Sequence, residues 1–361
     1  MSITFWWIAF IAIFVIVYSI DLYVTDHRKG TVSVKTSLRW TGAWISIALI
    51  FGVLLYFFFP QNPDVAKNTA HEMGMKFIAG YLTEYSLSVD NLFVFIMIFS
   101  MMNIGEHNQP KLLKLGIMIS IVLRILFILV GMGLVARFHW LMYIFGAILI
   151  WTAYKMAFSG GDENVNPKGN ILYRGAAKIF PIYPDEHSSH FFVKDGGKRF
   201  ITVIFLALLV IGSTDILFAF DSIPAIIGVI SEGEAGVLTL AEENFLAISS
   251  NVFAVMGLIS LFFALKGIMG MFRFLKHGVS FILLFIGLKM LLGFFHPVEE
   301  FFKAYSWVSL AVIVLTLAFS IVLSMLISDE KKIGELKDKL HEEHILDGWE
   351  VGENEQIDDA K

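Results

Sequence analysis

The sequence contains nine apolar segments, each about as long as a bilayer-spanning α-helix. Such a helix needs about 20 mostly apolar residues. In lipid every backbone N–H and C=O group must bond within the protein, so segments of this kind fold as helices. The sequence therefore predicts an all-α fold, a polytopic membrane helix bundle of about nine transmembrane helices. The segments lie near residues 4–24, 40–59, 77–102, 112–136, 138–158, 200–231, 244–266, 274–294 and 305–328.

The composition agrees with a membrane protein and excludes several other classes. Hydrophobic residues make up 57% of the 361 positions and charged residues only 16%, whereas soluble domains carry about 25% charged residues. There is no cysteine, so neither a disulfide framework nor a thiolate metal site is possible. No basic patch favours nucleic acid. No P-loop, zinc-protease motif or nucleophile elbow indicates an enzyme, and no cofactor is expected.

The lysine and arginine residues predict the orientation of the chain. Of the 27 basic residues, Lys67, Lys76, Arg137 and Lys303 alone fall in the even-numbered loops between the predicted helices, while Arg124, Lys155 and Lys289 lie inside helices. The rest fall in the odd-numbered loops and the C-terminal tail. Because basic loops stay in the cytoplasm, we expect a multi-pass protein of the cell inner (plasma) membrane, with the N-terminus outside and the C-terminus cytoplasmic. The first segment lacks a basic leader, so it is interpreted as a membrane helix and not as a signal peptide.

Polar residues interrupt two of the apolar segments in the same pattern. In each, a threonine and an acid are followed after five residues by an aspartate and a polar residue, with an offset of 131 residues between the copies. The same offset relates Ser120 to Asn251. This duplication predicts that 77–158 and 200–294 are two three-helix repeats. The copies of the pattern are Thr83-Glu84 with Asp90-Asn91, and Thr214-Asp215 with Asp221-Ser222.

The repeats divide the chain into six predicted regions. The charge distribution makes the first helix of one repeat run inward and that of the other run outward, so the repeats are inverted. Inverted repeats are typical of secondary transporters, which bind their substrate near the bilayer midplane between the copies. The regions are 1–76, two N-terminal transmembrane helices; 77–158, the first repeat; 159–199, a cytoplasmic loop; 200–294, the second, inverted repeat; 295–328, the final transmembrane helix; and 329–361, a charged cytoplasmic tail.

The two acidic motifs predict a site for a divalent cation. An isolated carboxylate near the bilayer centre costs roughly 2.5–3.5 kcal/mol, so a cation, a proton or a basic side chain must compensate it. Carboxylate, amide and hydroxyl oxygens suit Mg²⁺, Ca²⁺ and Mn²⁺. The candidate ligands are Glu84, Asp90, Asn91, Asp215, Asp221, Ser222 and Asn251.

Three further expectations concern the surroundings of these residues. Asp90 and Asp221 lie six positions after the first acid of each motif, about 120° around an ideal helix. We therefore expect the helices to break near both residues, assisted in the second copy by Pro224. Arg124 either pairs with a carboxylate or gates the pathway. The alternative to a cation site is that the acids are structural and form buried hydrogen bonds and ion pairs, with Arg124 as a candidate partner. Lys155 and Lys289, near helix ends, are expected to reach the membrane interface.

The acidic motifs resemble the signatures of the TerC/Alx family of membrane proteins. The first resemblance is carried by residues 83–95, TEYSLSVDNLFVF, and the second by residues 215–225, DILFAFDSIPA, with further matches at residues 190–193 and 250–258. The family often has a glutamate three residues before the first aspartate of the second signature, and here that position is Gly212. The resemblance implies roles for Glu84, Asp90, Asp215 and Asp221, and manganese as the transported ion.

Two functions follow as hypotheses. The first is a divalent cation transporter, with Mn²⁺ efflux for metal homeostasis as the activity that the resemblance implies. The second is a membrane-embedded interaction or metal-delivery protein of the tellurium-resistance or stress type, with little transport of its own. Tellurite is an oxyanion and would be repelled by a carboxylate-lined site. The partners expected are the cation and the lipid bilayer; protein partners are unknown.

Overall fold

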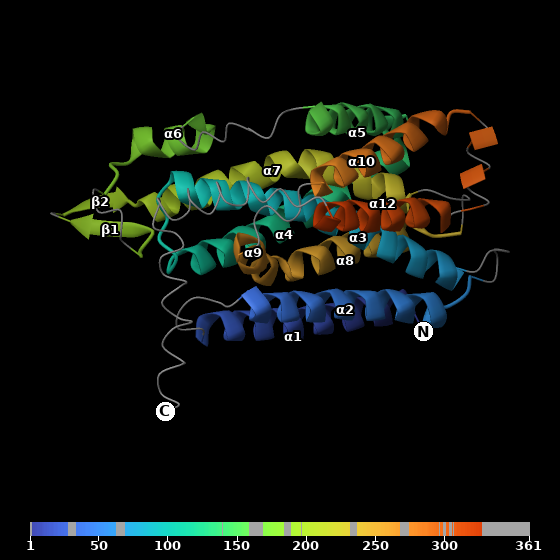
Figure 1. Cartoon of the computed structure of the whole chain (residues 1–361), viewed down its shortest axis with the longest axis horizontal. Coiled ribbons are helices and arrows are strands. Elements are labelled where there is room, and N and C mark those ends of the chain that lie inside the picture. The colour runs from blue at the N-terminus through green and yellow to red at the C-terminus, as the bar shows by residue number, and fades with distance from the viewer. Residues whose placement is uncertain are drawn as a thin grey trace.

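The computed structural model describes residues 2–27, 34–62, 69–138, 140–158, 169–183, 189–195, 197–231, 237–267, 274–295, 297–298, 301–302, 305 and 307–326. At a few of these positions, Asp90 and Asp221 among them, only the backbone is described. The long helices in these ranges form a single bundle (Figure 1), which confirms the predicted all-α class. They are α1 (Ile3–His27), α2 (Val34–Phe58), α3 (Thr69–Met101), α4 (Gln109–Arg137), α5 (Leu141–Phe158), α7 (Val203–Ile230), α8 (Leu240–Met256), α9 (Leu258–Gly267), α10 (Leu275–Leu292) and α12 (Trp307–Leu326).

Seven helices of the described chain are long and apolar enough to cross a membrane, and the number rises to eight if α8 and α9 form one bent span. The segment His277–Leu292 of α10 is apolar but shorter. The protein is thus a multi-pass membrane protein. Each of the nine predicted segments corresponds to a helix or to the α8–α9 pair, but whether all nine cross the bilayer stays a prediction.

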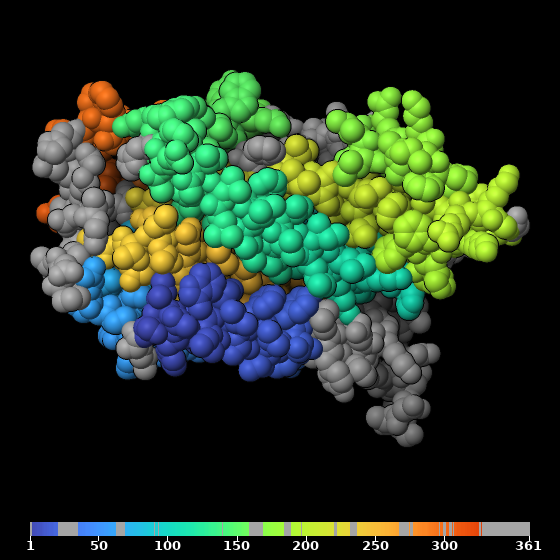
Figure 2. Space-filling model, turned by 180° about the vertical axis from the view of Figure 1, so that it is seen from behind, coloured from blue at the N-terminus to red at the C-terminus, as the bar shows by residue number. Residues whose placement is uncertain are grey.

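Helices α3, α4, α7 and α8 pack against one another at the centre of the bundle. Helices α1 and α2 cover one side of this core, and α5 with α10 lies on the opposite side (Figure 1). Helix α12 packs against α10 and α3. From behind, α1 and the diagonal α4 make up much of the surface (Figure 2), while residues 245–256 of α8 are buried. The side chains at the centre of the bundle are therefore enclosed by other helices.

Large apolar side chains are exposed on many outer helices. Examples are Trp151 on α5 at 68% exposed, Leu217 on α7 at 63% and Phe319 on α12 at 67%. Soluble monomers rarely expose apolar patches above a few hundred Å². A bilayer removes this cost because lipid tails are as apolar as the side chains. The outer surface thus supports the membrane assignment.

The predicted cytoplasmic loop contains secondary structure that the sequence did not reveal. Helix α6 (Ile171–Ile179) starts at Asn170, whose side chain accepts hydrogen bonds from the N–H groups of Leu172 and Tyr173. Strands β1 (Phe192–Asp195) and β2 (Lys198–Ile201) form an antiparallel hairpin that projects from one end of the bundle (Figures 1 and 2). Elements this short carry too few periodic positions to stand out in a sequence.

The predicted breaks near Asp90 and Asp221 are wrong. Helices α3 and α7 are continuous through both positions. Near Asp90 the sequence offers neither proline nor glycine to interrupt the backbone. In α7, Pro224 lies inside the helix and its flanking residues are buried. Packing by neighbouring helices makes proline tolerable in membrane helices.

The backbone instead bends between α8 and α9, which meet at 40° around Gly257. A Cβ atom at Gly257 would lie 3.2 Å from the Cβ of Trp44 on α2, so the missing side chain permits a close approach there. The predicted single helix at 244–266 is therefore two helices.

Each helix of the first predicted repeat packs against its predicted counterpart: α3 against α7, α4 against α8, and α5 against α10. The α5–α10 contact is reciprocal. A Cβ on Gly146 would lie 2.9 Å from the carbonyl oxygen of Gly287, and a Cβ on Gly287 would lie 2.8 Å from that of Gly146. Small residues allow membrane helices to approach in this way. These contacts are those expected of two related halves, although the inverted symmetry itself stays a prediction.

We predict that Gly287→Ala destabilises the protein by about 1–3 kcal/mol, the usual effect of overpacking, because the added methyl group would meet the backbone of α5. Gly133→Ala is the control, since a Cβ there meets nothing within 4 Å and alanine is the better helix former by about 1 kcal/mol. Thermal midpoints of the purified proteins in detergent measure both changes. Equal midpoints for the two variants would contradict this account of the α5–α10 contact.

Candidate functional site

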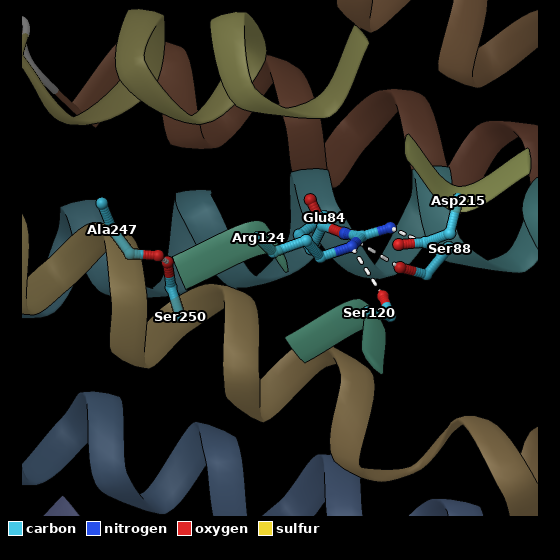
Figure 3. Close-up of polar contacts among 7 residues, drawn as sticks. All are labelled: Glu84, Ser88, Ser120, Arg124, Asp215, Ala247 and Ser250. Atoms are coloured by element: carbon cyan, nitrogen blue, oxygen red, sulfur yellow. Dashed lines mark hydrogen bonds and ion pairs between the residues drawn. The ribbon is translucent and has the colours of Figure 1, made fainter. Parts of the chain in front are cut away.

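Two buried acids, one from each predicted repeat, converge on one arginine inside the bundle. Glu84 lies near the middle of α3 and Asp215 near the middle of α7. Arg124, near the middle of α4, extends its guanidinium group between them (Figure 3). Its Nη1 atom forms an ion pair with Oε1 of Glu84, and its Nη2 atom lies 3.4 Å from Oδ1 of Asp215. We call these three residues the acid–arginine cluster.

The acid–arginine cluster is closed off from solvent. Glu84 is 0% exposed, Arg124 1% and Asp215 4%. With both acids ionised, the cluster carries two negative charges and one positive charge. Burying charges is costly unless they are paired and hydrogen-bonded, so the residual negative charge is a feature that an added cation would compensate.

Two serines hold the cluster in place. Ser88, one turn after Glu84, donates a hydrogen bond to Glu84 Oε1 at 3.1 Å. Ser120, one turn before Arg124, accepts a hydrogen bond from Arg124 Nε at 3.1 Å. The second oxygen of each acid, Oε2 of Glu84 and Oδ2 of Asp215, has no hydrogen-bond partner among the described residues. These two oxygens remain available to a ligand.

The structure brings together two of the seven predicted ligands, Glu84 and Asp215. Asn251 on α8 and Ser222 on α7 are each 1% exposed, and their polar side-chain atoms have no hydrogen-bond partner in the described chain. Asn91 is partly buried. The side chains of Asp90 and Asp221 lie outside the described residues, so their predicted role stays a prediction.

Among the side chains that the structure describes, no group of three or more histidines and acids is close enough to hold a metal ion. The two acids that meet are compensated by Arg124, as the sequence had offered as one alternative. If Arg124 is a permanent partner of the acids, the cluster is a structural ion pair. If Arg124 can withdraw from the acids, the cluster can bind a cation.

Other buried cations were placed differently by sequence reasoning. Lys289 was expected at the membrane interface, but it is 6% exposed and donates a hydrogen bond to Ser309 Oγ on α12 at 2.8 Å. Lys266 at the end of α9 contacts Glu106 Oε1 at 2.5 Å and Gln109 Oε1 at 3.4 Å. These contacts join helices distant in sequence, and nothing in the local sequence pattern indicates them.

The geometry defines a multi-pass membrane protein with two buried acids and an arginine between its central helices. The chain belongs to the family described as "Integral membrane protein TerC family", which matches residues 69–332. The matched range contains the whole acid–arginine cluster, and the resemblance seen in the sequence is confirmed.

Curated relatives match most of the chain. An uncharacterized membrane protein of Myxococcus xanthus is 38% identical over 320 residues, which is 89% of this chain and 92% of that protein. The Escherichia coli K12 protein named "Putative membrane-bound redox modulator Alx" is 34% identical over 294 residues, 80% of this chain and 87% of that protein. An uncharacterized membrane protein of Rickettsia felis is 32% identical over 321 residues, 89% of this chain and 97% of that protein. No solved structure matches the chain.

We predict that Glu84→Gln lowers the free energy of unfolding by about 3 kcal/mol, at the lower end of the range for breaking a buried ion pair, because Asp215 still compensates Arg124. Ser88→Ala, which removes one hydrogen bond to the same carboxylate, should cost about 1 kcal/mol. Unfolding of both variants by a denaturing detergent, followed by circular dichroism, measures the difference. A smaller loss for Glu84→Gln than for Ser88→Ala would show that the ion pair does not stabilise the bundle.

Proposed function

We propose that this protein transports a divalent metal cation across the membrane, with Mn²⁺ efflux as its activity. The observation that carries the proposal is the meeting of Glu84 from α3 and Asp215 from α7 inside the bundle. Each acid has an unpartnered oxygen, and with both acids ionised the cluster carries a net negative charge. Carboxylate oxygens are suitable ligands for Mn²⁺.

The location of the cluster supports transport more than permanent metal storage. The two acids belong to different predicted repeats, and transporters that use inverted repeats bind substrate between the copies. Movement of α3 relative to α7 would change the distance between the acids. In the proposed site, Glu84, Asp90, Asp215 and Asp221 bind the ion, and Asn91, Ser222 and Asn251 complete its shell.

The Escherichia coli relative is named a putative redox modulator, and the amino-acid composition of this chain limits what a redox role could be here. The chain has no cysteine, so its own side chains cannot exchange thiols and disulfides. A redox effect of this protein would have to arise by another route, and control of a redox-active metal ion is one. The same negative charge disfavours tellurite as direct cargo, so we assign tellurium resistance, if this chain confers it, to altered metal balance.

The orientation is part of the proposal. We propose that the chain lies in the inner membrane with the N-terminus outside and the C-terminus in the cytoplasm, and the distribution of basic residues supports this orientation. The turn before α4 that holds Glu106, the end of α9 that holds Lys266, and the hairpin of β1 and β2 would then face the cytoplasm. Cytoplasmic Mn²⁺ would enter the bundle from this end.

In proteoliposomes, we expect the purified protein to carry Mn²⁺, with Mg²⁺, Ca²⁺ and Zn²⁺ as the comparison panel. Glu84→Gln, Asp90→Asn, Asp215→Asn and Asp221→Asn should each reduce the flux by about tenfold or more, since even supporting residues of metal sites give 10–100-fold effects. Asp195→Asn, an equivalent change at an exposed position of β1, is the control. Absence of flux for every ion would reject transport and favour the interaction or metal-delivery function.

Gly212→Glu tests the departure from the family pattern. A Cβ atom at Gly212 meets nothing within 4 Å, so a side chain can begin there without a clash, one turn before Asp215. We expect Gly212→Glu to bind Mn²⁺ about tenfold more tightly, because affinity rises with the number of charged ligands. Gly212→Gln has the same shape without the charge. If the two variants bind Mn²⁺ equally, position 212 does not contribute to the cation site.

A further inference from the structure

Arg124 is supplied by one of the two predicted repeats only. The offset of 131 residues that relates Glu84 to Asp215 places Val255 of α8 at the position equivalent to Arg124. Val255 is 0% exposed and lies in the apolar core. Because an apolar residue fills the equivalent position, helix packing by itself does not require arginine there. The arginine at position 124 is therefore explained by its ion pairs with the two acids and not by packing.

The guanidinium group lies where a cation shared by both acids would lie. Two of its nitrogens face two different carboxylates, one from each repeat (Figure 3). A divalent cation bound between Glu84 and Asp215 would draw on the same two carboxylate groups that Arg124 now contacts. The ion and the guanidinium group are therefore competitors for one pair of acids.

The charge balance makes this competition strong. Within the acid–arginine cluster alone, without Asp90 and Asp221, two ionised carboxylates and one guanidinium group sum to −1, and a divalent ion added beside the guanidinium group would bring the sum to +1. If the guanidinium group withdraws, the two acids and the ion sum to zero. In a medium of low dielectric constant, like charges at contact distance repel strongly. The ion therefore binds best when Arg124 has left the acids.

We propose that Arg124 is an internal counter-cation that occupies the Glu84–Asp215 pair in the metal-free state and that the transported cation displaces. The inference rests on the proposed function, because it concerns the same site. Return of the guanidinium group would drive release of the ion. With the guanidinium group back between them, the two acids would also be compensated while the empty protein changes conformation. Ser120, hydrogen-bonded to Arg124 Nε, would guide the side chain.

The test is equilibrium binding of Mn²⁺ to the purified full-length protein by isothermal titration calorimetry. Arg124→Gln removes the competing charge and should bind Mn²⁺ about tenfold more tightly than the wild type, or better. Arg124→Lys keeps the charge and should stay near the wild-type affinity. Arg137→Gln, at the end of the same helix, is the control and should not change affinity. In proteoliposomes, Arg124→Gln should carry less Mn²⁺ than the wild type, because release is slowed.

Unchanged or weaker affinity in folded Arg124→Gln would overturn the inference and make Arg124 a structural partner of the acids. If this variant does not fold, Arg124→Gln/Asp215→Asn is compared with Asp215→Asn; the double variant restores the net charge of −1. Tighter binding by the double variant supports competition, and equal binding rejects it.

Failure of the proposed function gives a different result. Absence of wild-type flux together with tighter binding by Arg124→Gln would reject transport and keep the counter-cation. Normal flux together with unchanged affinity in Arg124→Gln would keep transport and reject the counter-cation. Absence of Mn²⁺ binding in every variant would reject both transport and the counter-cation.

Discussion

The ion pair of Arg124 with Glu84 and Asp215 is the interaction on which the interior of this protein depends. It joins α3, α4 and α7 at three positions that are almost completely buried. Ionised groups are costly within a membrane protein unless they are paired, and here three of them compensate one another only in part. Replacing a buried ion pair of this kind by well-packed apolar residues is often neutral or stabilising, so the cluster is not the most stable way to fill the centre of the bundle.

Under the proposed function, the same arrangement would keep the cation site from collapsing when the cation is absent. Two carboxylates facing each other in a low-dielectric interior would repel, and the helices that hold them would separate. The guanidinium group prevents this by lying between them. It leaves one oxygen of each acid unpartnered, and with both acids ionised the cluster has a net negative charge. Under the proposed function, both features would favour a divalent ion over an anion.

Much of the architecture could be predicted from sequence because the bilayer restricts what an apolar segment can do. Long apolar runs must form helices, and the described helices lie where the nine segments are. The expectation of breaks near Asp90 and Asp221 failed because it considered one helix at a time. In the bundle, α7 continues through Pro224 among buried neighbours, and the bend lies at Gly257, where α2 approaches closely. Helix α6 and the hairpin were missed because short elements have little periodicity.

For the candidate site, the sequence by itself determined which residues are chemically unusual. Acids and an arginine within apolar segments stand out whatever the fold, and their duplication related Glu84 to Asp215. Only the tertiary structure decided that these two acids meet and that Arg124 lies between them, because contacts between residues 84, 124 and 215 depend on how three helices pack. The burial of Lys289 against α12 was decided in the same way. Sequence periodicity describes one helix at a time, whereas the partners of a buried charge are chosen by the arrangement of all the helices around it.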